Sequence, residues 1–178
     1  GVDSTAVVMN LKKLGLRPLA LHLDNGWNSE LAVDNIKNAL VKLDIDLYTH
    51  VLDWDEFRDL QLAFLKASVP NAEVPTDHAI VAITFKVAMK HGIKYIVNGG
   101  NVSTESFVPS AWTSDARDLR HLKAIHKEFG TLPLRTFPTM GIPGYLYAVL
   151  IKGIRWLSLL NYMNYRKSEV MKVLQEEL

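Results

Sequence analysis

The sequence contains no cysteine and carries no strong excess of charge of either sign. Without cysteine these 178 residues can form no disulfide, no cysteine-ligated zinc site and no thiol nucleophile. The 20 basic and 19 acidic side chains nearly cancel, which argues against a protein that coats duplex nucleic acid, although a local basic patch is not excluded. The longest apolar stretch, residues 145–160, is interrupted by Lys152 and Arg155. We therefore expect a packing helix there and no membrane span.

The composition is that of an ordinary folded domain. Apolar residues make up 48% of the chain and charged residues 22%, so disorder is not expected. Residues 1–4 lack the basic and apolar regions of a secretory signal. Together with the absence of cysteine, this predicts a cytoplasmic protein.

Helical and strand patterns alternate along the first hundred residues. We expect helices over residues 4–14, 29–43, 54–66 and 77–90, with strands over 19–23, 46–52 and 95–97. This alternation predicts an α/β fold with a parallel sheet and helices on both faces. Further helices are expected over residues 116–129, 145–160 and 167–176. We therefore divide the chain into an α/β core, residues 1–110, and a helical C-terminal extension of the same domain, residues 111–178.

The chain opens directly on a glycine turn and a helix, Gly1-Val2-Asp3-Ser4-Thr5. A doubly wound sheet normally begins with a central strand that feeds such a turn, so we expect the given sequence to lack its first strand. A glycine turn at a helix N-terminus directs backbone N–H groups and the positive end of the helix dipole at one point, which suits phosphate. Asp3 can hold magnesium and Ser4 can donate to phosphate, but either can equally be a simple N-cap.

Two other segments follow predicted strands, where ligands bind in such sheets. In the first, Gly99, Gly100 and Asn101 would let a nucleotide approach the backbone, and Glu105 can be a second magnesium ligand. The alternative is an ordinary Asn-Gly turn. In the second, Asp24 can accept from an adenine amine or a ribose hydroxyl, beside Trp27 as a substrate contact. A structural turn with an exposed tryptophan explains that segment equally well.

Two groups of residues could bind the substrate. Asp77 and His78 open the helix that is apolar almost all round, and the alternatives are a helix cap and a buried core histidine. Arg117, Arg120 and Lys123 fall on one side of the helix expected over residues 116–129. They can hold the leaving pyrophosphate or an anionic substrate, but such a stripe is usually only a solvated face.

Residues 1–4 resemble the end of the Ser-Gly-Gly-x-Asp-Ser loop of the N-type ATP pyrophosphatases, or PP-loop proteins, which have the Rossmann-like adenine nucleotide alpha hydrolase fold. Residues 99–105 are similar to a Gly-x-x-Asn-x-Ser-x-Glu segment of NAD synthetase. Over nearly its whole length the chain resembles the N-acetyl sugar amidotransferases of bacterial surface polysaccharide biosynthesis, including lipopolysaccharide and O-antigen. The matching stretches are residues 21–29, 67–80 and 118–130.

This resemblance implies an ATP- and magnesium-dependent enzyme that forms AMP and pyrophosphate. The acetamido oxygen of a nucleotide-linked N-acetyl sugar would accept AMP, and ammonia would then displace the AMP to give an acetamidino group. The resemblance assigns Asp3 and Glu105 to magnesium, and Gly1, Val2, Ser4 and Thr5 to the pyrophosphate loop. It assigns Asp24 and the segment 99–101 to adenosine, and Arg120 or Lys123 to phosphate or an acid group of the sugar.

Partners follow from the same resemblance. Since the chain has no cysteine nucleophile, ammonia is expected from a separate glutaminase subunit. We expect neither a nucleic-acid partner nor a membrane span, and a homo-oligomer is left open. The alternatives are a PP-loop enzyme that modifies tRNA and a module that binds ATP without catalysis. A tRNA enzyme should carry a broader basic surface, and a sensor has no need of two metal-binding carboxylates.

Overall fold

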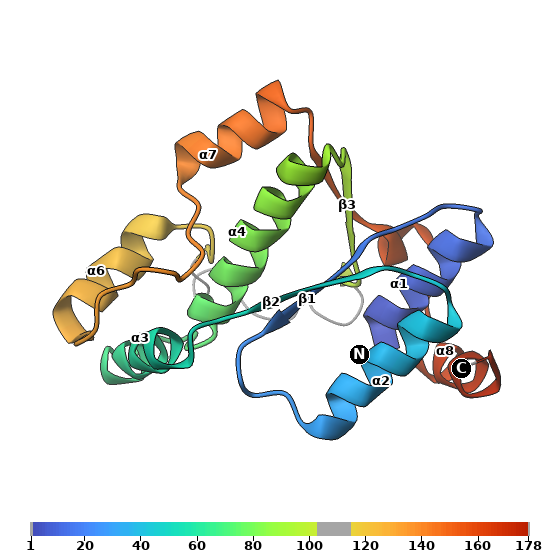
Figure 1. Cartoon of the computed structure of the whole chain (residues 1–178), viewed down its shortest axis with the longest axis horizontal. Coiled ribbons are helices and arrows are strands. Elements are labelled where there is room, and N and C mark those ends of the chain that lie inside the picture. Colours follow the sequence, from blue (N-terminus) through green and yellow to red (C-terminus); the bar gives the residue numbers. More distant parts are fainter. Residues whose placement is uncertain (1, 103–114, 178) are drawn as a thin grey trace.

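The computed structural model describes residues 2–102 and 115–177, and it shows an α/β protein (Figure 1). The predicted alternation of the first hundred residues is confirmed. In chain order the elements are α1 Val2–Lys13, β1 Ala20–Asp24, α2 Glu30–Lys42, β2 Leu47–Val51, α3 Trp54–Lys66, α4 Val74–His91 and β3 Tyr95–Asn98, then α6 Leu119–Phe129, α7 Ile142–Leu146, a π-helix Tyr147–Ile151, β4 Arg155–Ser158, a 3-10 helix Leu159–Tyr162 and α8 Lys167–Glu177.

All strand pairing in the described residues is parallel. β1 pairs with β2 in the register Ala20↔Leu47, and β3 pairs with β4 in the register Tyr95↔Arg155. One sheet was expected, but within residues 2–102 and 115–177 the strand pairs β1–β2 and β3–β4 form two separate two-stranded sheets. There, no strand pairs with the second edge of β1 or of β3.

The expected helix over residues 145–160 is wrong in its second half. The helix ends near Gly153, whose φ of 66° lies in the left-handed region that glycine tolerates best. The chain then turns into β4, which finds β3 as its partner. A short apolar run is compatible with a buried strand as well as with a helix, and here its pairing with β3 makes it a strand. The C-terminal third therefore contributes a strand to the fold as well as helices.

The core lies on both sides of α4, which is buried along most of its length as predicted. Near its start, Ala79 packs in a cluster with Phe57 and Phe64 of α3 and with residues of α6. Near its end, Phe85 packs with Ile96 and with residues of the π-helix, and its ring stacks on Trp156 of β4. No helix in the described part of the chain has both the length and the apolar character needed to cross a membrane.

Two carboxylates of α3 fasten the loop between α6 and α7. Asp59 accepts hydrogen bonds from the backbone and hydroxyl of Thr131 and from the Leu132 N–H. The buried Glu56 accepts from the three consecutive N–H groups of residues 135–137, at 2.9–3.1 Å. Burial alone would raise the pKa of each carboxyl, but these donors outweigh it and hold both pKa values below their ordinary range. The ionised carboxylates therefore fix the course of a loop whose end lines the cavity described below.

Candidate functional site

The N-terminus of α1 lies against the glycine pair that follows β3. A Cβ on Gly99 would lie 2.8 Å from the Ser4 nitrogen and 3.0 Å from the carbonyl carbon of Asp3. Only glycine permits so close an approach of the strand end to the helix. The side chain of Asn98 accepts from the Gly100 N–H at 3.0 Å and sets the turn. The two segments that the sequence singled out for phosphate and nucleotide therefore meet at one place.

Asp3 is the acidic residue of the first turn of α1, and it is half-buried. Its carboxylate accepts a hydrogen bond from the Tyr165 hydroxyl. Burial, together with this bond, raises the pKa of Tyr165 to about 12, so the phenol stays protonated and remains a donor. Of the neighbouring predicted residues, Ser4 is exposed, whereas Val2 and Thr5 are half-buried. The carboxylate of Asp3 is thus oriented from a distant part of the chain.

Two of the predicted phosphate and magnesium residues, Gly1 and Glu105, lie outside the described residues. Among those described, no three histidine, aspartate or glutamate side chains gather so that they could hold a metal ion. Asp3 therefore stands as a single described candidate ligand, and the two-carboxylate magnesium site stays a prediction. Asn101, from the same nucleotide prediction, is buried with 5% of its surface exposed.

Asp24 ends β1, as expected, but its side chain serves the turn that follows. One of its oxygens accepts from the Gly26 N–H at 3.0 Å and from the Asn28 side chain at 3.3 Å. Trp27 is 67% exposed and meets Trp54 edge to face, with the ring centroids 5.5 Å apart. These contacts are those of the structural turn that the sequence left as an alternative, and the adenosine role of Asp24 and the substrate role of Trp27 stay predictions.

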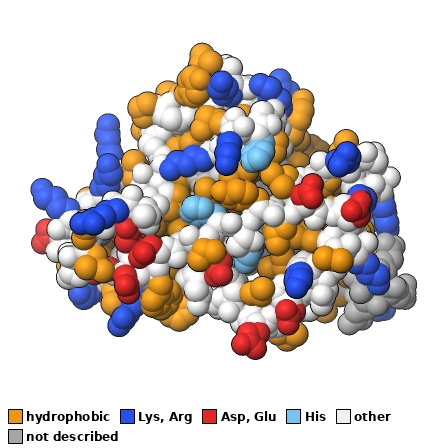
Figure 2. Space-filling view, in the orientation of Figure 1, with side chains coloured by type: hydrophobic (Ala, Val, Ile, Leu, Met, Phe, Trp, Pro, Cys, Tyr) orange, Lys and Arg blue, Asp and Glu red, His pale blue; other side chains and the backbone are white. Residues whose placement is uncertain are grey.

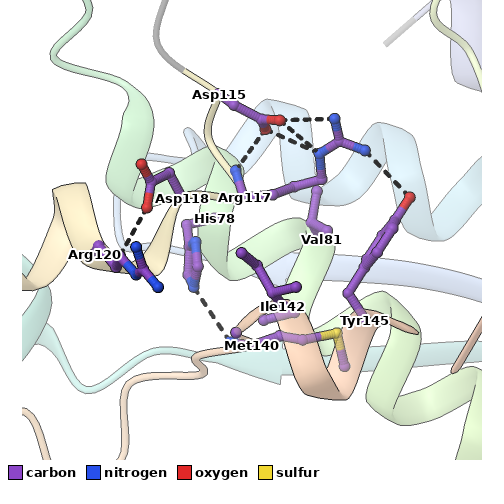
Figure 3. A pocket seen from close by; sticks show the side chains of 11 residues that line it. His78, Val81, Asp115, Arg117, Asp118, Arg120, Met140, Ile142 and Tyr145 are labelled. Carbon is purple, nitrogen blue, oxygen red and sulfur yellow. Dashed lines mark hydrogen bonds and ion pairs between the residues drawn. The ribbon is translucent and has the colours of Figure 1, made fainter. Parts of the chain in front are cut away.

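A cavity of about 420 Å³ lies between the first half of α4, the start of α6 and α7 (Figure 3). His78 and Arg117 line it, as does Arg120, so three predicted substrate or phosphate residues meet here. Most of the remaining wall is apolar. The apolar part is formed by Val81, Ala82, Met140, Ile142 and the ring of Tyr145, while the carboxylates of Asp115, which pairs with Arg117, and of Asp118 also line the cavity.

His78 is almost fully buried at the inner wall of this cavity. Its Nδ1 lies 2.6 Å from the Ala116 carbonyl oxygen, and its Nε2 accepts the Met140 N–H at 3.3 Å. Because Nε2 accepts, the ring proton must be on Nδ1 and the ring is neutral. Burial lowers the pKa of His78, which keeps the ring uncharged. The ring therefore joins α4 to the two loops that flank the cavity, as a satisfied core histidine does.

The side chain of Arg117 is exposed, but its guanidinium is engaged by partners within the protein. Its guanidinium forms a two-pronged ion pair with Asp115, the shortest N–O distance being 2.7 Å, and donates to the Tyr145 hydroxyl at 3.2 Å. The pair with Asp115 chiefly accounts for a raised pKa of Arg117 and a lowered pKa of Asp115. Arg117 thus holds Tyr145 against the cavity, as Figure 3 shows. By contrast, the guanidinium of Arg120 has no partner among the described residues and can bind an anion.

The basic stripe expected along residues 116–129 is wrong for Arg117. The helix begins only at Leu119, because the Asp118 side chain caps it by accepting from the N–H groups of Arg120 and His121. Arg117 therefore lies before the helix, whereas Lys123 is exposed on it and does not line the cavity.

Asp77 lies in the first turn of α4 and does not line the cavity either. The residue is exposed overall, yet partial burial of its carboxyl and the nearby Glu73 raise its pKa. Its predicted substrate role stays a prediction.

Sequence reasoning missed Tyr145, which lines the cavity, and it missed Asn161 and Tyr165, which hydrogen-bond to Val102 and Asp3. Each lies in the last third of the chain, which was expected to be a helical extension. The only signal for Asn161 and Tyr165 was the polar and aromatic run 161–165 after an apolar stretch, and this run does not show which residue it will meet. Tyr145 begins the apolar stretch itself and had no such signal.

No family model matches the sequence, and no curated protein matches it. Among solved structures, the chain is similar to a crystal structure of a predicted subunit of tRNA methyltransferase from Methanocaldococcus jannaschii. The superposition covers 99% of this chain and 72% of that one, with 17% identical residues and a TM-score of 0.50. At this identity the likeness shows the fold alone. It confirms the Rossmann-like α/β class, and it gives no particular support to the amidotransferase resemblance.

Proposed function

We propose that this protein binds ATP at the N-terminus of α1 and transfers AMP to an acceptor oxygen with release of pyrophosphate. The observation that carries the proposal is the approach of Gly99 to Asp3 and Ser4. It places the helix N-terminus, where the first N–H groups have no partner within the helix and the helix dipole is positive, beside the glycine pair at the end of a parallel strand. Such a junction suits both parts of a nucleotide, because helix N-termini bind phosphate and nucleotides bind where parallel strands end.

The described residues fit the triphosphate better than they fit the metal. The first turn of α1 offers backbone donors, and its exposed Ser4 offers a hydroxyl. Asp3 supplies one carboxylate for magnesium, and Glu105 is the second ligand that the sequence predicts. Magnesium bound with the nucleotide would neutralise charge on the phosphates. The chain's own part is to hold the triphosphate in place and to orient Asp3 through Tyr165.

The cavity beside α4 is the proposed acceptor site. Its volume of about 420 Å³ suits a small molecule, and its apolar wall with one uncommitted guanidinium suits a ligand that has an anionic group. A nucleotide-linked N-acetyl sugar has this character. The resemblance in residues 67–80 and 118–130, which include His78 and Arg120, supports such an acceptor. The acetamido oxygen would accept AMP, and ammonia from a separate glutaminase would displace it.

The second candidate is ATP-dependent modification of tRNA. The comparison with solved structures favours it over the sugar, since the similar protein is a predicted subunit of tRNA methyltransferase. On the face in Figure 2, however, lysine and arginine side chains are interspersed with acidic and apolar ones instead of forming a continuous basic surface. Pyrophosphate release by the full-length chain should be measured with magnesium, ammonium and either UDP-linked N-acetyl sugars or tRNA. The acceptor that triggers release identifies the function. ATP binding without release under either acceptor would indicate a non-catalytic module.

The first prediction concerns Asp3. Asp3→Asn is expected to lower acceptor-dependent pyrophosphate release at least about 100-fold, because it removes a carboxylate from the place where charge is neutralised. Asp34→Asn, on the exposed side of α2, is the matched control and should retain full release. Wild-type activity in Asp3→Asn would contradict the proposed site.

The second prediction concerns Arg120. Arg120→Ala is expected to raise the KM for an anionic acceptor about 10-fold or more, because a charge-assisted hydrogen bond contributes about 1.5–3 kcal/mol. The KM for ATP should stay within about twofold, since Arg120 lines the cavity and not the α1 terminus. Lys123→Ala, one turn along the same helix and outside the cavity, is the control. An equal rise in both variants would place the acceptor elsewhere.

A further inference from the structure

The segment after β4 reaches both halves of the proposed nucleotide site. β3 and β4 are parallel, and their last paired residues are Asn98 and Ser158, so the carboxyl ends of both strands lie side by side. The glycine pair follows β3 at this end, and the 3-10 helix Leu159–Tyr162 follows β4. Pairing of the two strands therefore brings residues 159–165 to residues 99–102, from which they are distant in the sequence.

Two hydrogen bonds tie this segment to the site. The Asn161 side-chain oxygen accepts from the Val102 N–H at 2.8 Å and fixes the chain just after the glycine pair. The Tyr165 hydroxyl donates to Asp3. Leu160, only 2% exposed, buries part of this segment in the protein. α8, which begins two residues after Tyr165, packs along α1 (Figure 1).

We infer that Asn161 and Tyr165 are positioning residues of the nucleotide site. Asn161 holds the chain that follows the glycine pair in place beside α1, and Tyr165 holds the Asp3 carboxylate in one orientation. Neither residue needs to touch the nucleotide, because each acts through the residue that it contacts. The inference rests on the proposed function and deepens it, since it adds a second set of residues to the same site.

Tyr165→Phe tests the contact with Asp3, because it removes the hydroxyl and keeps the ring. Tyr162→Phe is the matched control, since Tyr162 lies in the same segment and is 81% exposed. Binding of a fluorescent ATP analogue to the full-length chain is measured as a function of magnesium concentration. Tyr165→Phe is expected to raise the magnesium concentration for half-maximal binding about 10-fold, and Tyr162→Phe less than about twofold. Equal behaviour of the two variants would overturn the role of Tyr165.

A double-mutant cycle separates positioning from general support of the fold. If Tyr165 acts only through Asp3, adding Tyr165→Phe to Asp3→Asn weakens analogue binding no further. If the two losses are independent and multiply, Tyr165 acts through something other than Asp3 and the inference fails. Thermal unfolding of Tyr165→Phe within about 2 °C of Tyr162→Phe is expected, because both keep the ring in place.

Asn161 is tested without any nucleotide. Amide hydrogen exchange at Val102 should be protected in the wild type, accelerated about 10-fold or more in Asn161→Ala, and restored in Asn161→Asp, which keeps an accepting oxygen. The affinity of Asn161→Ala for the fluorescent ATP analogue should fall to about a tenth of the wild-type affinity. Unchanged exchange or unchanged binding in Asn161→Ala would overturn its role. A wild type that binds no analogue would contradict the proposed function itself. A wild type that binds while both variants match their controls overturns only this inference.

Discussion

Replacing Gly99 with alanine is expected to weaken ATP binding by the full-length chain about 100-fold. The added Cβ would lie 2.8 Å from the Ser4 nitrogen and 3.0 Å from the Asp3 carbonyl carbon, so the strand end or the helix must shift. Both are backbone atoms held in place by the surrounding elements, and a misplacement of about 1 Å can cost about 100-fold where function depends on exact positioning. Titration with a fluorescent ATP analogue measures the change.

Gly144→Ala is the control for this substitution. Its Cβ would meet only the flexible Met140 side chain, at 3.4 Å from Cγ, so the site beside α1 should be unaffected. Gly99→Ala is also expected to lower the free energy of unfolding by about 1–3 kcal/mol, because overpacking strains the junction. Wild-type binding by Gly99→Ala would mean that the close approach has no part in holding a nucleotide.

Glu56→Ala is expected to lower the free energy of unfolding by about 3 kcal/mol. It leaves the N–H groups of Arg135, Thr136 and Phe137 without their acceptor, and it opens a small gap under the loop. For a chain of this length the midpoint of thermal unfolding should fall by about 6–12 °C. Circular dichroism measures the midpoint, and Glu128→Ala, which is exposed on α6, should change the free energy by less than about 0.5 kcal/mol.

The pH dependence of stability follows from the same two carboxylates. The pKa values of Glu56 and Asp59 are lowered in the folded protein from ordinary values of 4.5 and 3.8. Their contribution to the free energy of unfolding is therefore complete above about pH 4.5, where these groups are ionised in the unfolded chain as well. It is lost as the pH falls through their pKa values in the folded protein. Urea unfolding between pH 3 and 7 should show the loss in the wild type. Glu56→Gln, which is less stable at pH 7, should show a shallower decline.

The local elements could be read from the sequence because their signals are local. α3 has the predicted bounds, since Asp53 caps its start and its apolar residues keep a helical spacing. α2 likewise begins after the predicted Ser29, whose side chain caps it. The meeting of Gly99 with the start of α1 also follows from the rule that ligands gather where parallel strands end.

The sequence could not show which residues meet across long distances. Arg117 has the spacing of a helical stripe, but the helix begins only after Asp118, which caps it. The charge of Arg117 is neutralised by Asp115. His78 can be a ligand or a core residue by sequence, and the two loop contacts that satisfy its ring arise only after folding. Tyr165 carries no motif, and its role depends on the pairing of β3 with β4.

That pairing also has a consequence for synthesis. A ribosome finishes β3 before it makes α6, α7 and β4, so during this interval the β3 edge that later takes β4 has no strand beside it. An open edge of this kind invites pairing with other chains, which makes the nascent protein a candidate for chaperone protection. Because Asn161 and Tyr165 emerge later still, the capacity to hold a nucleotide should arise late in translation, well after the glycine pair has left the exit tunnel.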